Sequence, residues 1–195
     1  MTKLDELINA FLNLQGIGRK SATRIAFDIL KRDKEEIEKF INTIKTAYDT
    51  IKPCKICKML TDTTICNICS NEKRNHSILC IVEDTKDVFA IEKSNVYNGI
   101  YHVLGGKVDP LNGITLDDLY IPELINRLDS VNEIIFALNP DLEGETTILY
   151  LTKLLPKNIK ISKIASGIPM GGNIEYADII TLTKSLEGRQ IIQNE

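Results

Sequence analysis

The 195-residue sequence lacks tryptophan, and only 6% of its residues are aromatic. This scarcity argues against a carbohydrate-binding site or an aromatic cage, because both rely on aromatic faces. No apolar run approaches the ~18–20 residues needed to cross a bilayer. Residues 1–13 alternate charged and apolar side chains without the apolar core of a secretory signal. We therefore expect a cytoplasmic protein with no membrane segment.

Charge is unevenly spread along the chain. Residues 1–75 hold 14 basic and 10 acidic side chains, whereas residues 76–195 hold 10 basic and 17 acidic ones. The net charge of −3 is therefore the sum of a basic N-terminal region and an acidic C-terminal region. A basic segment can meet phosphates, and an acidic segment can hold a metal ion or meet a basic partner protein.

The spacing of apolar residues predicts an α+β chain with several parts. Roughly the first 50 residues have helical periodicity, with a break at 15–18 and a predicted capping box of Asp33 and Glu36 before a third helix. From Ser77 onward, short apolar runs alternate with helical segments, which predicts an α/β layer with a mostly parallel sheet. The expected strands are 78–82, 99–104, 134–138 and 159–164, and the expected helices are 88–91, 116–128 (kinked or split at Pro122) and 144–155.

Four of the five cysteines form two Cys-x2-Cys pairs, Cys54 with Cys57 and Cys66 with Cys69. Two such pairs complete a tetrahedral zinc site of the structural type, because four thiolates leave no open coordination position. The alternative is a set of unrelated buried or redox-active cysteines. Residues 53–75 hold too little apolar mass for a core, so we expect Cys57→Ser to unfold this module alone. Cys80 lies in an apolar run and is expected to be an inert buried residue.

A glycine turn, Gly16-Ile17-Gly18, joins the first two predicted helices and precedes a basic segment. Glycines let the backbone approach a phosphate closely, and the N-terminus of the next helix offers unpaired N–H groups. The alternative is a simple helical hairpin with a solvated basic face. We expect sequence-independent DNA binding by Gly16, Gly18, Arg19, Lys20 and Arg24.

Acidic residues follow two of the predicted strands: Glu83 after the first, and Asp141, Glu143 and Glu145 after another. Carboxylates in such loops can bind magnesium, or they can be solvated acids that favour a helix N-terminus. The pattern resembles the Toprim domain of topoisomerases and bacterial primases. That domain has a strand-end Glu and an Asp-x-Asp, which Glu-Gly-Glu follows in the type IA topoisomerases. Asn139 replaces the first Asp, so we expect these acids to form a partner surface without chemistry.

The order of the motifs is similar to that of the RecR family of bacterial recombination mediators, across essentially the whole chain. Further matching segments are Tyr101–Gly106, Glu175–Asp178 and Leu186–Arg189. The resemblance implies a helix-hairpin-helix at 1–52, a four-cysteine zinc finger at 53–75, a Toprim domain at 76–173 and a C-terminal segment at 174–195. Gln15 and Arg19 stand where the family usually has proline, while Asn139-Pro140 is usual in it.

The resemblance also implies a function. Members of this family are non-enzymatic DNA-repair proteins that form a homodimer or a ring-like homotetramer. They act with RecO or RecF to help load RecA onto gapped DNA, which places them at the nucleoid, and their DNA-contacting residues map onto Lys20 and Arg24.

Two other functions compete with this interpretation. The first is a magnesium-dependent Toprim nuclease or topoisomerase. A topoisomerase also needs a large gate domain with a tyrosine nucleophile, for which 195 residues leave no space, and Asn139 argues against a nuclease. The second is a scaffold protein that zinc stabilises and that does not contact DNA. The basic N-terminal region disfavours this alternative.

Overall fold

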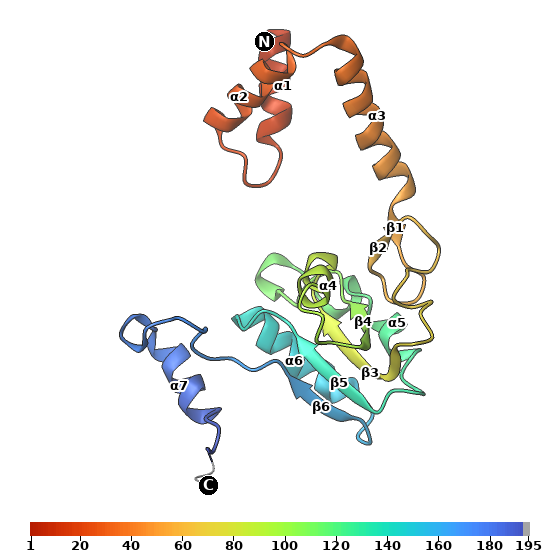
Figure 1. Ribbon diagram of the computed structural model, residues 1–195, viewed down its shortest axis with the longest axis vertical. Helices are drawn as coiled ribbons and strands as arrows, with labels where there is room; N and C mark the ends of the chain where they lie inside the picture. Colours follow the sequence, from red (N-terminus) through yellow and green to blue (C-terminus); the bar gives the residue numbers. More distant parts are fainter. Residues whose placement is uncertain (193–195) are drawn as a thin grey trace. The chain divides into compact units, whose positions relative to one another are not determined.

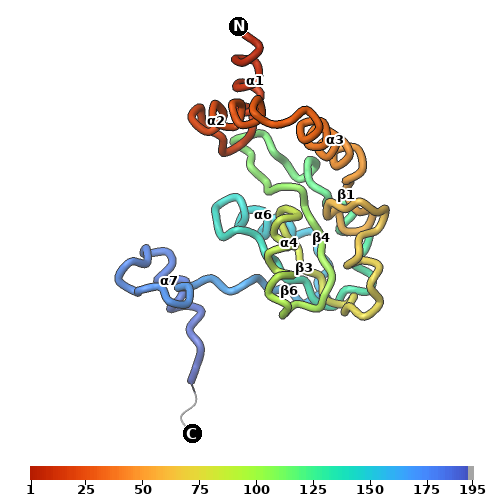
Figure 2. The backbone as a smooth tube through the Cα atoms, turned by 45° about the horizontal axis from the view of Figure 1, so that its top comes forward, coloured from red at the N-terminus to blue at the C-terminus, as the bar shows by residue number. Residues whose placement is uncertain are grey.

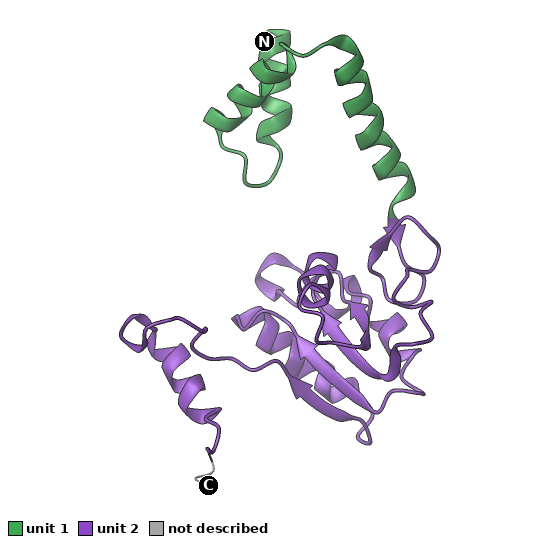
Figure 3. Cartoon of the chain, viewed as in Figure 1, with its two compact units in different colours: residues 1–51 green, residues 52–195 purple. Residues whose placement is uncertain are grey.

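A computed structural model describes residues 1–192, and the chain divides into two compact units, residues 1–51 and residues 52–195 (Figure 3). Unit 1 contains helices α1 (Lys3–Leu12), α2 (Arg19–Ile29) and α3 (Lys34–Thr50). The first two helices pack against each other, and the buried residues of α2 are Ala22 and Ala26. Small side chains at these positions allow a close approach of the helices. The helical periodicity predicted for this region is confirmed.

Helix capping in unit 1 differs from the sequence prediction. Asp33 is the N-cap residue of α3, but its side chain makes no capping hydrogen bond, so the predicted capping box with Glu36 is wrong. A capping box occurs instead at α1. There the N–H of Asp5 donates to Thr2 Oγ1 (3.2 Å), and the N–H of Thr2 donates to Asp5 Oδ2 (2.9 Å). The start of α1 is therefore fixed by local side-chain contacts, whereas α3 begins without them.

Unit 2 is built on a four-stranded parallel sheet (Figure 1). Its strands are β3 (Asn75–Val82), β4 (Gly99–Val103), β5 (Glu133–Ala137) and β6 (Lys160–Lys163). The order across the sheet is β4-β3-β5-β6, and Cys80 of β3 lies between Tyr101 and Ile135 of its neighbours. Because all the strands run in one direction, their carboxyl ends meet at one edge. The predicted parallel sheet is confirmed.

Helices and the cysteine module cover both faces of the sheet. The helices are α4 (Thr85–Glu92), α5 (Ile121–Ile125) and α6 (Leu142–Leu154). Leu79 and Ile81 of β3 belong to a core that includes residues of α5 and α6. Cys80 and Val82 belong to a second core, which includes residues of α4 and three of the paired cysteines. Successive strand residues point to opposite faces, so burial on both faces explains the continuous apolar run of β3.

The segment 116–128, predicted as a helix that Pro122 kinks or splits, is split. It forms a 3₁₀ turn, η2 (Leu116–Asp118), and the short helix α5, with a break at Leu119-Tyr120. Pro122 lies in the first turn of α5, where its missing N–H would have no partner within the helix. Ile121 and Leu124 of α5 are buried in the sheet core, and Leu116 of η2 is partly buried against it, so the apolar spacing predicted the buried face although the helix is broken.

After β6 the chain leaves the sheet and ends in η3 (Ile174–Tyr176) and α7 (Ile179–Glu187) (Figures 1 and 2). Asp178 caps α7 by accepting a hydrogen bond from the N–H of Thr181 (2.9 Å). The N–H of Ile168 donates to Ser185 Oγ of α7 (3.1 Å) and so ties the connecting loop to the helix. The remaining elements are the paired strands β1 (Lys52–Pro53) and β2 (Leu60–Thr61) and the 3₁₀ turn η1 (Pro110–Asn112). Within residues 1–192, no helix has the length and apolar character needed to cross a membrane.

Candidate functional site

The glycine turn between α1 and α2 leaves a helix end open. Gly16 has a φ of +79°, a left-handed conformation that glycine adopts without steric cost. Gly18 is the N-cap of α2 and has no side chain to bond the first-turn N–H groups. A Cβ atom at either glycine would meet no atom within 4 Å, so a ligand can approach the backbone here. The first turn of α2 contains no acidic residue, and its positive end is therefore suited to an anion.

The basic residues predicted to bind DNA are exposed on α2. Arg19 and Lys20 begin the helix, and Arg24 follows Lys20 by one turn. Lys20 and Arg24 therefore share a helix face, which lies opposite the buried Ala22 and Ala26. Among residues 1–192, neither Lys20 nor Arg24 forms an ion pair. The turn and these side chains together present cations and N–H donors on one surface, which suits a phosphate backbone.

The four paired cysteines form a compact cluster that can hold one metal ion. Their Sγ atoms all lie within 4.8 Å of one another, and those of Cys57 and Cys66 are 3.5 Å apart. Sulfurs around a tetrahedral zinc ion, with Zn–S of ~2.3 Å, are about 3.8 Å apart, so the donor set fits such an ion. Cys54, Cys57 and Cys66 are buried, and Cys69 is half-buried.

Backbone N–H groups donate to two of the sulfurs and favour their thiolate forms. The N–H of Cys66 donates to Cys54 Sγ (3.3 Å), and the N–H of Cys69 donates to Cys66 Sγ (3.4 Å). Hydrogen bonds with Cys57 and Cys69 lower the pKa of the Cys66 thiol, whereas hydrogen bonds with Cys66 and Cys69 and burial raise the pKa of the Cys57 thiol. Burial alone raises the pKa of the Cys80 thiol to about 12. Cys80 is buried in the core, as predicted, and its inertness stays a prediction.

The cysteine module is docked on the sheet rather than separate from it. The N–H of Val103 at the end of β4 donates to the carbonyl of Cys57 (2.8 Å), and the N–H of Leu60 donates to Thr85 Oγ1 (3.0 Å). Lys58 pairs with Glu123 of α5 at 2.9 Å. Three of the cysteines also belong to the same buried core as the second face of β3. These contacts argue against the expectation that Cys57→Ser unfolds this module alone.

The predicted acidic residues gather at the carboxyl edge of the sheet, but a lysine lies among them. Lys107 Nζ is 2.5 Å from Asp141 Oδ2 and 3.4 Å from Glu83 Oε2. The amide Nδ2 of Asn139 donates to the same Glu83 oxygen at 3.1 Å. Asp141 also caps α6 by accepting from the N–H of Gly144 at 2.8 Å. Burial would raise the pKa of Asp141, but these donors lower it, so this carboxylate stays ionised.

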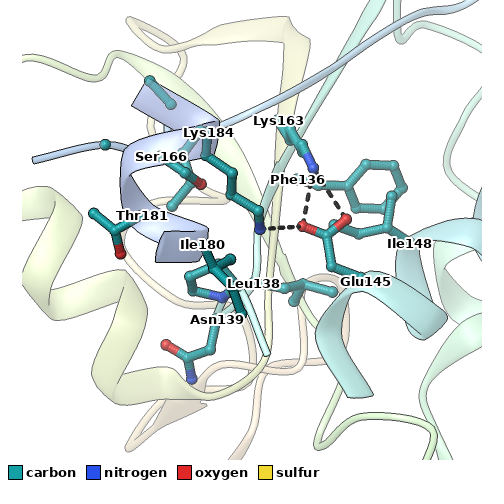
Figure 4. Close-up of a pocket in the computed structure, with 14 residues that line it drawn as sticks. Phe136, Leu138, Asn139, Glu145, Ile148, Lys163, Ser166, Ile180, Thr181 and Lys184 are labelled. Carbon is teal, nitrogen blue, oxygen red and sulfur yellow. Dashed lines mark hydrogen bonds and ion pairs between the residues drawn. The ribbon is translucent and has the colours of Figure 1, made fainter. Parts of the chain in front are cut away.

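Glu145 is held by lysines of two other elements. Lys163 Nζ of β6 donates to both carboxylate oxygens (2.9 and 3.0 Å), and Lys184 Nζ of α7 lies 3.3 Å from Oε1 (Figure 4). Glu145, Lys163 and Lys184 line a pocket of about 290 Å³ between the sheet edge and α7. Glu145 therefore joins the C-terminal helix to the sheet. Within residues 1–192, Glu143 is the one acid of the predicted set that forms no ion pair.

Sequence reasoning did not find Lys107, Lys163 and Lys184 as partners of the acids. A signal existed for Lys107, because it follows the carboxyl end of β4, the strand beside β3. The same rule that places acids at this edge also places Lys107 there. For Lys184 no such signal exists, because its position depends on how α7 folds back.

Comparison with protein families supports each part of this description. Residues 4–48 match the RecR helix-hairpin-helix family, residues 77–165 match the Toprim domain family, and residues 167–190 match the RecR C-terminal family. The four-cysteine cluster lies between the first two matched regions, at the place of the zinc finger that the sequence resemblance predicts. Two family-specific matches thus enclose a Toprim domain and a cysteine cluster in the expected order, and the chain belongs to the RecR family.

Proposed function

We propose that this chain is a non-enzymatic mediator of recombinational DNA repair that binds DNA without reading its sequence. The RecR-family domains support a role in recombination and repair, with DNA binding and oligomerisation. The observation that carries the DNA contact is the open N-terminus of α2, beside Gly16 and the exposed Lys20 and Arg24. Such a surface contacts phosphates, so its affinity depends on salt and not on base sequence.

Replacing both Lys20 and Arg24 by alanine is expected to weaken binding to all DNA sequences alike. Removal of each cation that neutralises a phosphate should reduce the salt dependence of log K by roughly 0.7 for single strands or 0.9 for duplex. At about 0.1 M salt, loss of this contribution relative to 1 M salt corresponds to about five- to eightfold lower affinity for each cation. Fluorescence anisotropy with labelled oligonucleotides of unrelated sequence measures both quantities.

The matched control is Lys31→Ala, which removes a cation beyond the other end of α2. We expect it to change the affinity little. Wild-type binding by the Lys20→Ala, Arg24→Ala double variant would place the DNA contact elsewhere in the chain and overturn this part of the proposal.

We further propose that the cysteine cluster holds one structural zinc ion. Four sulfur donors favour zinc over magnesium or calcium, which prefer oxygen. Four thiolates leave no position for substrate, so such an ion supports the fold and takes no part in chemistry. Metal analysis of freshly purified protein is expected to give one zinc per chain.

An assembly of several copies would strengthen DNA binding, and we propose a homodimer or ring-like homotetramer. Phe40, Ile41 and Ile44 are each about half exposed on one face of α3, and no residue of this helix is buried. An apolar helix face of this kind supports association between copies. By analogy with the family, the assembly acts in the cytoplasm at the nucleoid, with RecO or RecF, to help load RecA onto gapped DNA.

The acidic edge of the sheet is the proposed docking surface for a basic partner such as RecO. Glu143 is the sharpest test, because its carboxylate has no lysine partner within residues 1–192. Glu143→Lys is expected to weaken partner binding, chiefly through the association rate, while DNA binding by the isolated protein stays close to wild type. Surface plasmon resonance at two salt concentrations measures the effect.

Glu72→Lys is the control for this experiment, because it makes the same charge change on the exposed loop after the second cysteine pair. If the effect came from net charge in general, both variants would bind the partner equally weakly. Equal partner binding by Glu143→Lys and wild type would remove this edge as the docking surface.

The enzymatic alternative has less support. The edge where a Toprim enzyme holds its metal carries the Lys107 ammonium, and the described histidines lie elsewhere: His76 is exposed beyond the cysteine module, and His102 is buried in β4. Burial lowers the pKa of His102 to about 4, so this ring stays neutral near pH 7. Magnesium-dependent DNA cleavage or relaxation that Glu83→Gln abolishes would favour the enzyme.

A further inference from the structure

The acids of the Toprim edge face a cation that the chain itself provides. Lys107 Nζ lies within ion-pair distance of both Asp141 (2.5 Å) and Glu83 (3.4 Å). The lysine side chain is only 16% exposed, and Glu83 is 22% exposed. The Asp141 side chain is 42% exposed, so water screens the pair of Lys107 with Glu83 less than the pair of Lys107 with Asp141.

The backbone fixes Lys107 in this position. Gly105 adopts a left-handed φ of +85°, and its N–H donates to the carbonyl of Glu83 at 3.0 Å. On the other side, the N–H of Val108 donates to the buried Thr147 Oγ1 of α6 at 2.9 Å. The loop is thus hydrogen-bonded to the end of β3 two residues before Lys107 and to α6 one residue after it. The backbone of this loop is therefore fixed on both sides of Lys107, and the ammonium group is held close to the acids.

The surrounding donors do not fit a divalent cation. Magnesium needs oxygen ligands at ~2.0–2.1 Å in nearly octahedral geometry and gives up its water reluctantly. At this edge, one oxygen of Asp141 accepts from Lys107, and one oxygen of Glu83 lies 3.4 Å from the same Nζ and accepts from the Asn139 amide. An ion placed there would have to displace the ammonium and would be repelled by it.

Lys107 remains charged under ordinary conditions. Burial alone would lower its pKa, but the hydrogen bond to Asp141 and the charge of Glu83 hold the pKa above its usual value. The ammonium is therefore present throughout the neutral pH range, and no change near pH 7 would free the acids for a metal.

We propose that the Lys107 ammonium permanently replaces the divalent cation of a Toprim site, so that the acids serve an internal ion-pair network. The network joins the loop after β4, the end of β3 and the N-terminus of α6. This inference does not depend on the DNA-mediator function. It predicts a latent metal site that appears when the ammonium is removed.

The test uses the full-length, zinc-loaded protein and Mn²⁺ as the probe, because electron paramagnetic resonance reports free aqueous Mn²⁺ directly. At about 1 mM metal, a range typical of weak carboxylate sites, wild type is expected to bind no Mn²⁺ at this edge. Lys107→Met should bind Mn²⁺ with a dissociation constant at least about tenfold below the detection limit set with wild type. Adding Glu83→Gln to Lys107→Met should abolish the gain, because it removes a carboxylate ligand.

Two controls make the result specific. Lys86→Met removes a lysine that pairs with Asp84 at 3.7 Å and is 73% exposed, so it should create no site. Lys107→Gln is measured in parallel, because a neutral polar side chain can keep the loop folded if methionine does not. Circular dichroism and zinc content identify the folded variants. Mn²⁺ binding by wild type that Glu83→Gln abolishes, or no gain in a folded Lys107 variant, would overturn the proposal.

Discussion

Cys57→Ser is expected to abolish stoichiometric zinc binding and to unfold much of residues 52–192, rather than the cysteine module alone. Cys57 is 1% exposed and belongs to the buried core that also contains Cys80, Val82 and Tyr101 of the sheet. Its carbonyl accepts the N–H of Val103, the last residue of the edge strand β4. Loss of the ion would therefore uncover one face of β3 and β4.

The expected loss of stability is large because zinc binding contributes strongly to the free energy of folding. Structural zinc binding by four-ligand modules has an apparent free energy of about 10–16 kcal/mol at neutral pH. The whole stability of a typical domain is about 5–15 kcal/mol. Even a fraction of the zinc contribution is therefore large enough to unfold the unit. We expect the cooperative thermal transition of the sheet to disappear or to fall by tens of degrees.

The measurement combines metal analysis with thermal denaturation followed by circular dichroism, and chelation of zinc from wild type should give the same result. Cys80→Ala is the matched control, because it removes a buried thiol of the same core that is not a ligand. It should cost about 1–2 kcal/mol and keep one zinc per chain. A Cys57→Ser protein with an unchanged sheet transition would show that the two parts are independent after all.

The sequence allows the main elements to be predicted where one local physical rule dominates. A continuous apolar run at 78–82 indicates a strand buried on both faces, and the structure has such a strand. The cysteine spacing predicts a cluster because two short turns bring four sulfurs together regardless of the surrounding fold. Gly16 likewise has the left-handed backbone that a glycine turn makes possible.

Features that depend on neighbours distant in sequence could not be predicted in the same way. The pairing of Lys107 with Asp141 requires β4 and β5 to flank β3, and apolar patterns do not specify strand order. The pairing of Lys184 with Glu145 requires α7 to bring Lys184 near the first turn of α6, 39 residues away in the sequence. The sequence therefore predicted the acids of the edge but overestimated their free negative charge.

Association of copies through α3 is the second large effect that we expect. The helix has 17 residues, none of them buried, and its apolar side chains recur three to four positions apart. Phe40, Ile41 and Ile44 are 48%, 56% and 54% exposed. Burial of such side chains is worth about 25 cal/mol per Å² of apolar surface removed from water. Two copies that bury these faces against each other would therefore be more stable than two solvated helices.

Ile41→Asp combined with Ile44→Asp is therefore expected to dissociate the assembly to single chains. Two carboxylates would be buried without partners in the interface, at a cost of several kcal/mol each. DNA affinity should fall by about 10²–10⁴, because simultaneous binding by linked copies raises the affinity by this factor. The glycine turn itself stays intact, so each single chain should keep its weak, salt-dependent binding.

Light scattering coupled to size-exclusion chromatography measures the mass, and anisotropy measures the DNA affinity. Thr43→Asp with Thr46→Asp is the matched control, because it adds the same two charges on the opposite face of α3, where both threonines are exposed. This control should keep the wild-type mass and affinity.

Dissociation by the control pair alone would assign the interface to the other face of α3. An unchanged mass in the isoleucine double variant, with helix content preserved, would mean that copies associate through a different surface. In that case the expected decrease in DNA affinity should be absent as well, because the number of glycine turns reaching one DNA molecule would be unchanged.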